Sequence, residues 1–209
     1  MRKKSSKRWL QEHFKDPYVK MAFVSGYRSR AAYKLIELQE KDHLFKPGMV
    51  IVELGAAPGG WTQVLHQLIQ PGGKVIALDI LPMTPISGVD FIQGDFTQEQ
   101  TLQVLTSKLQ AGSKLPINWV VSDMAPNLSG NASIDIPRSM YLAELALGFA
   151  LANLMPEGCF LIKVFQGEGF DSFLTSIKKA FEKVMIRKPR ASKAKSRELY
   201  IVAKGKRPI

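Results

Sequence analysis

Two patterns of apolar and polar positions divide this 209-residue chain. From about residue 46 onward, short apolar runs of strand length alternate with longer stretches whose apolar residues recur at helical spacing. The predicted strands are 49–54, 74–79, 89–93, 117–122, 159–165, 184–188 and 199–204, and the predicted helices are 61–69, 98–109, 136–154 and 170–184. This alternation predicts an α/β fold, with a mostly parallel seven-stranded sheet and helices on both of its faces.

The first 45 residues have a different pattern. They read as helical from 6 to 43, with Gly26 as a break and a second helix from about 30 to 41. Because no repeat and no low-complexity linker interrupts the sequence, we expect one domain over 1–209. Within it, 1–45 forms a basic arm with helices and 46–209 forms the α/β core.

The net charge of the chain narrows the class of binding partner. Lys and Arg outnumber Asp and Glu by 29 to 18, which gives a net charge of +11 and favours nucleic acid or an anionic membrane. A ribosome-associated protein without catalytic activity would show the same excess. Two basic clusters, Arg2–Arg8 and Arg187–Arg197, suggest a surface that follows phosphates. No apolar run reaches the roughly 18 residues of a membrane span, and the single Cys159 excludes an intramolecular disulfide and suits the cytoplasm.

A turn of small residues connects the first predicted strand to the helix that follows it. Gly55, Gly59 and Gly60 let the backbone approach a ligand, and Pro58 stiffens the turn. The turn is neither a Walker loop, which needs Gly-Lys-Ser/Thr, nor the G-x-G-x-x-G of dinucleotide sites. Taken alone, it is equally consistent with a plain strand-to-helix connection.

Acidic residues follow the next strands and favour a nucleoside ligand. Asp79 ends the second strand, where it could bind both hydroxyls of a ribose, and Asp95 follows the third, within reach of an adenine amino group. Asp123 follows the fourth strand at the same edge. S-adenosylmethionine has a ribose and an adenine without a demanding phosphate group and fits best, while a nicotinamide dinucleotide is the rival. No metal ligands are predicted.

Lys163 lies inside the apolar fifth strand and is the candidate for chemistry, because a lysine is costly to bury unless it is paired. Its neighbour at the same edge of the sheet would be Asp123. Lys34 belongs to a helical stripe with Arg30, Glu37 and Lys41, which is normally a solvated, ion-paired face. Glu198 begins the last strand and on its own looks like an ordinary strand-end charge.

These stretches together resemble the FtsJ/RrmJ family of 2′-O-methyltransferases, and the resemblance covers nearly the whole chain. The matching segments are Arg8-Trp-Leu-Gln-Glu-His-Phe, Arg28-Ser-Arg, Leu54-Gly-Ala-Ala-Pro-Gly-Gly-Trp, Val89-Asp-Phe-Ile-Gln-Gly-Asp-Phe, Ser122-Asp-Met-Ala-Pro-Asn, Asp135-Ile-Pro-Arg, Lys163-Val-Phe-Gln-Gly-Glu-Gly-Phe and Ser196-Arg-Glu-Leu-Tyr-Ile-Val-Ala. Departures are confined to the basic N-terminus and to 111–116, and neither touches a motif.

The resemblance implies a Rossmann-like S-adenosylmethionine-dependent methyltransferase fold and methylation of a uridine ribose in 23S ribosomal RNA. It places the family's catalytic Lys-Asp-Lys-Glu tetrad at Lys34, Asp123, Lys163 and Glu198, with Lys163 as general base. It places the cofactor contacts at Gly59, Trp61, Asp79, Asp95 and Asp123. Together with Gly55 and Pro58 of the turn, these residues form the predicted cofactor site. We expect a cytoplasmic monomer acting on RNA, within the large ribosomal subunit, and on no membrane. A non-catalytic assembly factor and a nicotinamide-dependent oxidoreductase stay open as alternatives.

Overall fold

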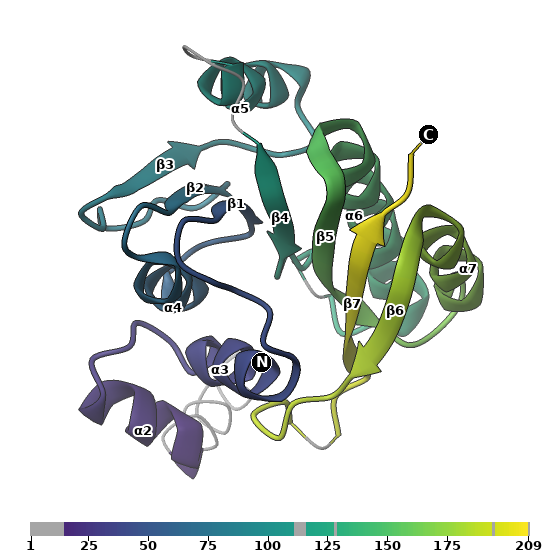
Figure 1. Cartoon of the computed structure of the whole chain (residues 1–209). Coiled ribbons are helices and arrows are strands. Elements are labelled where there is room, and N and C mark those ends of the chain that lie inside the picture. The colour runs from purple at the N-terminus through teal and green to yellow at the C-terminus, as the bar shows by residue number, and fades with distance from the viewer. Residues whose placement is uncertain (1–14, 111–115, 128, 194, 209) are drawn as a thin grey trace.

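A seven-stranded sheet forms the centre of the computed structural model, which describes residues 15–110, 116–127, 129–193 and 195–208. Its strands are β1 (Val50–Leu54), β2 (Lys74–Asp79), β3 (Val89–Gln93), β4 (Ile117–Ser122), β5 (Leu154–Phe165), β6 (Phe181–Arg187) and β7 (Glu198–Lys206). They lie in the order β3-β2-β1-β4-β5-β7-β6 (Figure 1), and β7 pairs antiparallel with both of its neighbours. The mostly parallel sheet expected from the sequence is therefore confirmed.

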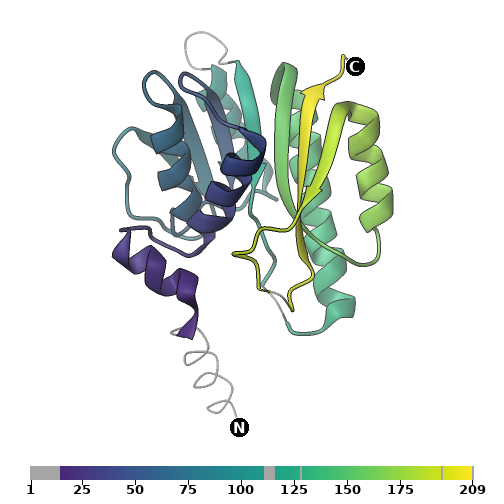
Figure 2. The ribbon, with the colours of Figure 1, turned by 60° about the horizontal axis from the view of Figure 1, so that its bottom comes forward.

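Helices cover both faces of the sheet, and each face has its own apolar core (Figure 2). Side chains of α5 (Glu99–Gln110), α6 (Ala132–Asn153) and α7 (Phe170–Ala180) pack on one face. Side chains of α3 (Ala31–Asp42) and α4 (Gly60–Ile69) pack on the other. None of the helices in the described ranges has the length and apolar composition needed to cross a bilayer.

The alternation of side chains along β5 decides where Lys163 points. Phe160, Ile162 and Val164 face the core under α6 and α7, whereas Leu161 faces the core under α3 and α4. Since successive side chains of a strand point to opposite faces, Lys163 shares the face of Leu161. It therefore lies at the carboxyl end of β5 on the side that α3 and α4 cover.

Among the described residues before β1, two helices are joined by a turn that contains Gly26, which has a φ of 72°. The first is α2 (Pro17–Val24), where the Asp16 side chain caps the helix by accepting the backbone N–H of Tyr18 at 3.0 Å. The second is α3, which ends at His43 in the left-handed conformation. The part of the predicted helix that covers 6–14, and the basic cluster 2–8, lie outside the described residues.

In three regions the element boundaries differ from the sequence prediction by three residues or more. The predicted helix 170–184 ends at Ala180, because Phe181, whose apolar spacing continues the helical pattern, instead begins β6 and pairs with Lys206 of β7. β5 begins at Leu154, since its Pro-Glu-Gly sequence forms an irregularity in the pairing with β4 and not a turn. α6 begins at Ala132, where the Asn131 side chain caps it.

Candidate active site

A hollow of about 460 Å³ opens at the carboxyl ends of β1 to β4. The strand order reverses between β1 and β4, and in open α/β sheets ligands bind at such a point. Its lining includes Gly55, Asp79, Asp95, Asp123, Asn127 and Leu142. Four residues predicted as cofactor contacts thus share one hollow, and the three acidic ones favour a ligand with positive charge.

The glycine turn forms one wall of this hollow. Gly55 has a φ of 81°, and a Cβ at this position would lie 2.7 Å from the backbone nitrogen of Met124. Gly59 has a φ of 105° and directly precedes α4. Both positions therefore require glycine, the first because the β1 and β4 ends approach so closely and both because of the backbone conformation.

The two acids after β2 and β3 are held by backbone groups. Asp79 accepts the N–H of Ala57 at Oδ2 and that of Leu81 at Oδ1, each at 2.8 Å. Asp95 accepts the N–H of Thr97 at 2.9 Å and its hydroxyl at 2.8 Å, both at Oδ1. Because each carboxylate oxygen can accept more than one hydrogen bond, these fixed groups keep acceptor capacity for a ligand.

Lys163 and Asp123 form a buried ion pair beside the hollow. Ser122 of β4 pairs in register with Ile162 of β5, so the residues that follow them are neighbours. The Lys163 Nζ lies 3.1 Å from Asp123 Oδ1 and donates a hydrogen bond to the Asp123 carbonyl oxygen at 2.6 Å. Lys163 is only 9% exposed. The structure therefore brings two of the predicted catalytic residues together and supplies the partners that a buried lysine needs.

The other two members of the tetrad meet across α3 and β7. The Lys34 Nζ lies 2.7 Å from Glu198 Oε1, and both side chains are mostly buried. The helical stripe of Lys34 is thus not a solvated face, because Arg30 and Glu37 also bond to the segment 190–191. Lys41 alone in that stripe is exposed.

Tyr200, which the sequence analysis did not single out, connects the two ion pairs. Its hydroxyl lies 3.1 Å from Asp123 Oδ1 and 3.2 Å from Glu198 Oε1. It stands opposite Lys163 in the β5–β7 pairing, and the Lys34 Nζ lies 5.7 Å from the centre of its ring. Its position two residues after Glu198 could have indicated it, since such residues share a face of a strand.

The charge states of this network follow from its burial. Burial raises the pKa of the Glu198 carboxyl, but the charge of Lys34 and its hydrogen bond, with smaller effects of Lys163 and Ser192, hold it below its usual value. The Ser192 hydroxyl donates to Glu198 Oε1 at 2.8 Å. Burial, then the charges of Asp123 and Glu198, raise the pKa of Tyr200 well above 10. At neutral pH Tyr200 is therefore a donor between two carboxylates.

Glu53, in the middle of β1, is a second residue that the sequence analysis missed. It is fully buried, and within the described residues neither of its carboxylate oxygens has a hydrogen-bond partner. Burial raises the pKa of Glu53 to about 8, the nearby Thr62 hydroxyl opposes this, and the charges of Asp123 and Asp79 add to it. The protonation of Glu53 therefore depends on the charges in the hollow, although Glu53 does not line it.

Arg28 connects the N-terminal helices to the glycine turn and to the segment after β2. Its Nη1 donates to the carbonyl oxygen of Thr84 at 2.5 Å and to that of Pro58 at 3.4 Å, and its Nη2 donates to Pro85 at 3.1 Å. A Cβ at Gly59 would lie 2.9 Å from its Nη1. One guanidinium thus holds the glycine turn and the segment after β2 together.

The remaining predicted cofactor residues take other places. Pro58 is exposed, Gly59 precedes α4, and neither belongs to the lining of the hollow. Trp61 is buried, donates its Nε1–H to the Ala31 carbonyl oxygen at 2.8 Å and packs 5.8 Å from the Tyr200 ring. In this arrangement Trp61 packs against Tyr200, which connects the two ion pairs of the tetrad. Its contact with a cofactor stays a prediction.

Comparison with known proteins gives one family. The model of the FtsJ-like methyltransferase family matches residues 27–206. The chain is 55% identical over 204 residues to a protein of Cellvibrio japonicus named ribosomal RNA large subunit methyltransferase E, covering 98% of this chain and 95% of that one.

Solved structures agree with this. A protein of Plasmodium falciparum assigned as a ribosomal RNA methyltransferase superposes with a TM-score of 0.76 at 30% identity, over 86% of this chain and 98% of its own. Human methyltransferase-like protein 13, solved in complex with S-adenosylhomocysteine, superposes with a TM-score of 0.55 at 16% identity, over 83% of this chain and 78% of its own. At that identity the second structure supports the fold alone.

Proposed function

The chain belongs to the FtsJ-like methyltransferase family, and we propose that its tetrad transfers a methyl group from S-adenosylmethionine to a ribose 2′-hydroxyl of large-subunit ribosomal RNA. The target is a uridine of 23S ribosomal RNA, and Lys163 is the general base. One observation carries the assignment of roles. Asp123 lines the hollow on one side and binds Lys163 on the other, so a group bound in the hollow and a hydroxyl at Lys163 are neighbours.

The hollow suits S-adenosylmethionine in charge and shape. The cofactor is a cation at its sulfonium, and three carboxylates line the hollow. A Cβ would close the approach at Gly55. In this proposal Asp79 binds the ribose hydroxyls and Asp95 the adenine, with Pro58, Gly59 and Trp61 as further contacts. When bound, the cofactor supplies an electrophilic methyl group on sulfur.

Lys163 acts as the base in its neutral amine form: its Nζ removes the proton of the attacking hydroxyl and becomes an ammonium. The 2′-oxygen forms the new bond to the methyl carbon, the bond from that carbon to sulfur breaks, and its electrons stay on sulfur. The leaving group is a neutral thioether, so it needs no acid. The proton accepted at Nζ is held between the carbonyl and carboxylate oxygens of Asp123, which stabilise the ammonium form.

The other pair of the tetrad orients the substrate. Glu198 and the Tyr200 ring hold the Lys34 ammonium in place, from where it donates to a ribose oxygen. We place the activity in the cytoplasm, in a monomer with one domain over 1–209, and on RNA within the large ribosomal subunit.

Methyl transfer tests the proposal directly. Tritiated S-adenosylmethionine is incubated with large ribosomal subunits that lack the modification and with naked 23S RNA, and the label is mapped to the nucleotide. The parent protein should label a ribose 2′-oxygen. Lys163→Ala should reduce the rate by about 10²–10⁴-fold, the usual contribution of a positioned base. Its affinity for S-adenosylmethionine, measured by calorimetry, should stay near that of the parent.

The exposed Lys178 of α7 provides the matched control, because Lys178→Ala removes the same side chain far from the hollow. Methyl transfer by Lys163→Ala at the parent's rate would remove Lys163 from the base role. A loss of cofactor affinity in parallel with the rate would make it a binding residue. No label from the parent on either RNA would refute the activity itself.

A further inference from the structure

The stretch from the last residue of β6 to the start of β7 carries basic side chains of two kinds. Arg187 is committed to Asp42, with its Nε 2.8 Å from Oδ2 and its Nη2 2.7 Å from Oδ1, and Lys188 donates to the Ser196 carbonyl oxygen at 3.0 Å. The other four, Arg190, Lys193, Lys195 and Arg197, are exposed, and none has a carboxylate within salt-bridge distance in the described part of the chain. We call these four the loop cations.

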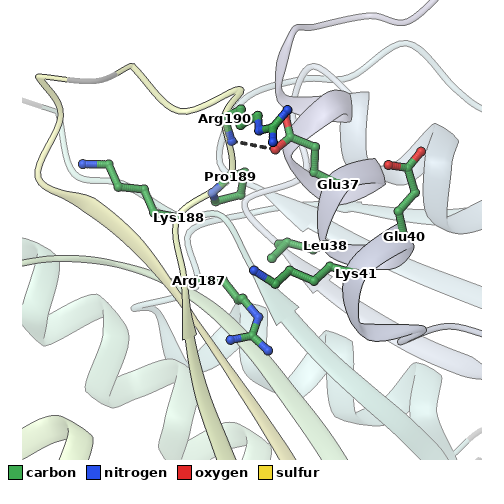
Figure 3. Close-up of a pocket in the computed structure, with 8 residues that line it drawn as sticks. All are labelled: Glu37, Leu38, Glu40, Lys41, Arg187, Lys188, Pro189 and Arg190. Carbon is green, nitrogen blue, oxygen red and sulfur yellow. Dashed lines mark hydrogen bonds between the residues drawn. The ribbon is translucent and has the colours of Figure 1, made fainter.

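The backbone that carries the loop cations is fastened to α3. The carboxylate of Glu37 accepts the N–H of Arg190 at 2.6 Å and that of Ala191 at 2.9 Å, and Figure 3 shows it turned towards this backbone while Lys188 points away from α3. Arg30 donates to the carbonyl oxygen of Ala191, which is completely buried. Two residues about two turns apart, the N-cap Arg30 and Glu37 of α3, therefore fix this segment.

The same segment is fastened to the tetrad. The Ser192 hydroxyl donates to Glu198, and the backbone N–H of Gln166, which directly follows β5, donates to the Arg197 carbonyl oxygen at 2.9 Å. Lys193, Lys195 and Arg197 thus lie on a stretch that leaves the site at Ser192 and returns to it at Glu198. Unpaired cations on a backbone held at both ends are arranged for a polyanion that passes the site.

We propose that the loop cations bind the RNA phosphates that flank the target nucleotide, and that Glu37 is the positioning residue that holds them in place. The assignment rests on the proposed function and identifies the RNA contacts of that site. It excludes Arg187, whose guanidinium is occupied by Asp42, although the sequence places it in the same basic cluster. Phosphate contacts of this kind fix position without reading the sequence, so they suit an enzyme whose specificity for RNA lies in the 2′-hydroxyl.

Salt dependence of RNA binding measures these contacts. The probe is a fluorescein-labelled, uridine-containing single-stranded RNA, and its Kd is followed by anisotropy at increasing KCl. Each cation that neutralises a phosphate contributes about 0.7 to the slope of log Kd against log salt. Substituting all four loop cations by Gln should lower the slope by about 3 and raise the KM for RNA, with kcat and the affinity for S-adenosylmethionine near the parent's values.

The matched control removes the same charge elsewhere. Lys46, Lys178, Lys179 and Lys183 are exposed and lie at the amino edge of the sheet, so their substitution by Gln also removes four positive charges from a net +11. If the slope falls equally in both variants, the effect comes from net charge alone and the proposal is overturned. Loss of binding to phosphatidylserine vesicles with unchanged RNA binding would assign the loop to a membrane surface instead. Because RNA binding is read without methyl transfer, an inactive parent would refute the proposed function but not this inference.

Substitution of Glu37 distinguishes two explanations, because a pure charge effect and a positioning effect would change the affinity for RNA in opposite directions. Removing a carboxylate next to an RNA site should tighten binding if charge alone matters. If Glu37 positions the loop, Glu37→Ala should weaken RNA binding several-fold. Glu37→Gln should restore part of it, because its one amide oxygen can replace one of the two carboxylate oxygens that accept the N–H groups of Arg190 and Ala191. Tighter binding by Glu37→Ala, or equal weakening by both variants at unchanged thermal stability, would overturn the positioning role.

Discussion

The buried carboxyl of Glu53 leads to a specific prediction about stability. Its pKa of about 8 in the folded protein compares with an ordinary value of 4.5. A folded-state pKa that is raised means that the folded protein keeps a proton which the unfolded chain has already released. The stabilisation is complete below pH 4.5, declines as the pH rises, and is lost once the pH passes about 8.

The size of the effect follows from the same two values. Each pH unit between them corresponds to about 1.4 kcal/mol of differential stability. From pH 5 to pH 8 the free energy of unfolding of the parent should therefore fall by about 3 to 4 kcal/mol on account of Glu53 alone. Glu53→Gln keeps the shape of the protonated side chain and removes the titration, so its stability should be flat over this range where the parent's declines.

Urea unfolding of both proteins at half-unit pH steps from 5 to 8 measures the difference. Other titrating groups cancel in the comparison, because they are the same in both proteins. Curves that run parallel over the whole range would refute the reasoning. Saturation with S-adenosylmethionine adds a second readout: a cation in the hollow should lower the pKa of Glu53, so the slope of the parent should become smaller in its presence.

Two further substitutions test the network and its support. Tyr200→Phe removes the hydrogen-bond donor between Asp123 and Glu198. It should lower the free energy of unfolding, measured by urea unfolding, by about 1.5–3 kcal/mol, which is the usual contribution of a hydrogen bond to a charged group. Unchanged stability would mean that these bonds do not form. Arg187→Ala leaves the buried carboxylate of Asp42 without its partner and should cost about 3 kcal/mol at pH 7. Its hydrogen bond to Arg187 holds the pKa of Asp42 below 3.8, so the difference from the parent should shrink as the pH falls below that value, and acid titration of both proteins would check it.

The fold was predictable because the signals for it are local. Strand-length apolar runs separated by helical stretches determine the α/β class, and the strands with β-branched residues were identified to within a few residues. The boundaries that failed depend on pairing with distant strands. Phe181 satisfies the helical spacing of α7, but pairing with β7 places it in a strand, and no local signal reveals that.

The site was only partly predictable from its residues. Asp79, Asp95 and Asp123 end successive parallel strands, so their convergence follows from the topology alone. Lys34 and Glu198 were different, because a helix face and a strand end give no sign that they meet. Only the family resemblance selected them. Tyr200 was accessible to reasoning from strand periodicity once Glu198 had been selected.

Helix α3 sets the distance between the catalytic tetrad and the proposed RNA contacts. Arg30, Lys34 and Glu37 lie on one face of α3 within about 10 Å, from the helical rise of 1.5 Å per residue. Lys34 binds Glu198 of the tetrad, while Arg30 and Glu37 hold the segment of the loop cations. α3 packs on α4 through the apolar core. It therefore fixes the position of a phosphate bound at the loop relative to that of a hydroxyl bound at Lys163. Substitutions on this face of α3 should therefore disturb RNA affinity and catalytic positioning together, whereas substitutions of Asp79 or Asp95 in the hollow should affect cofactor binding alone.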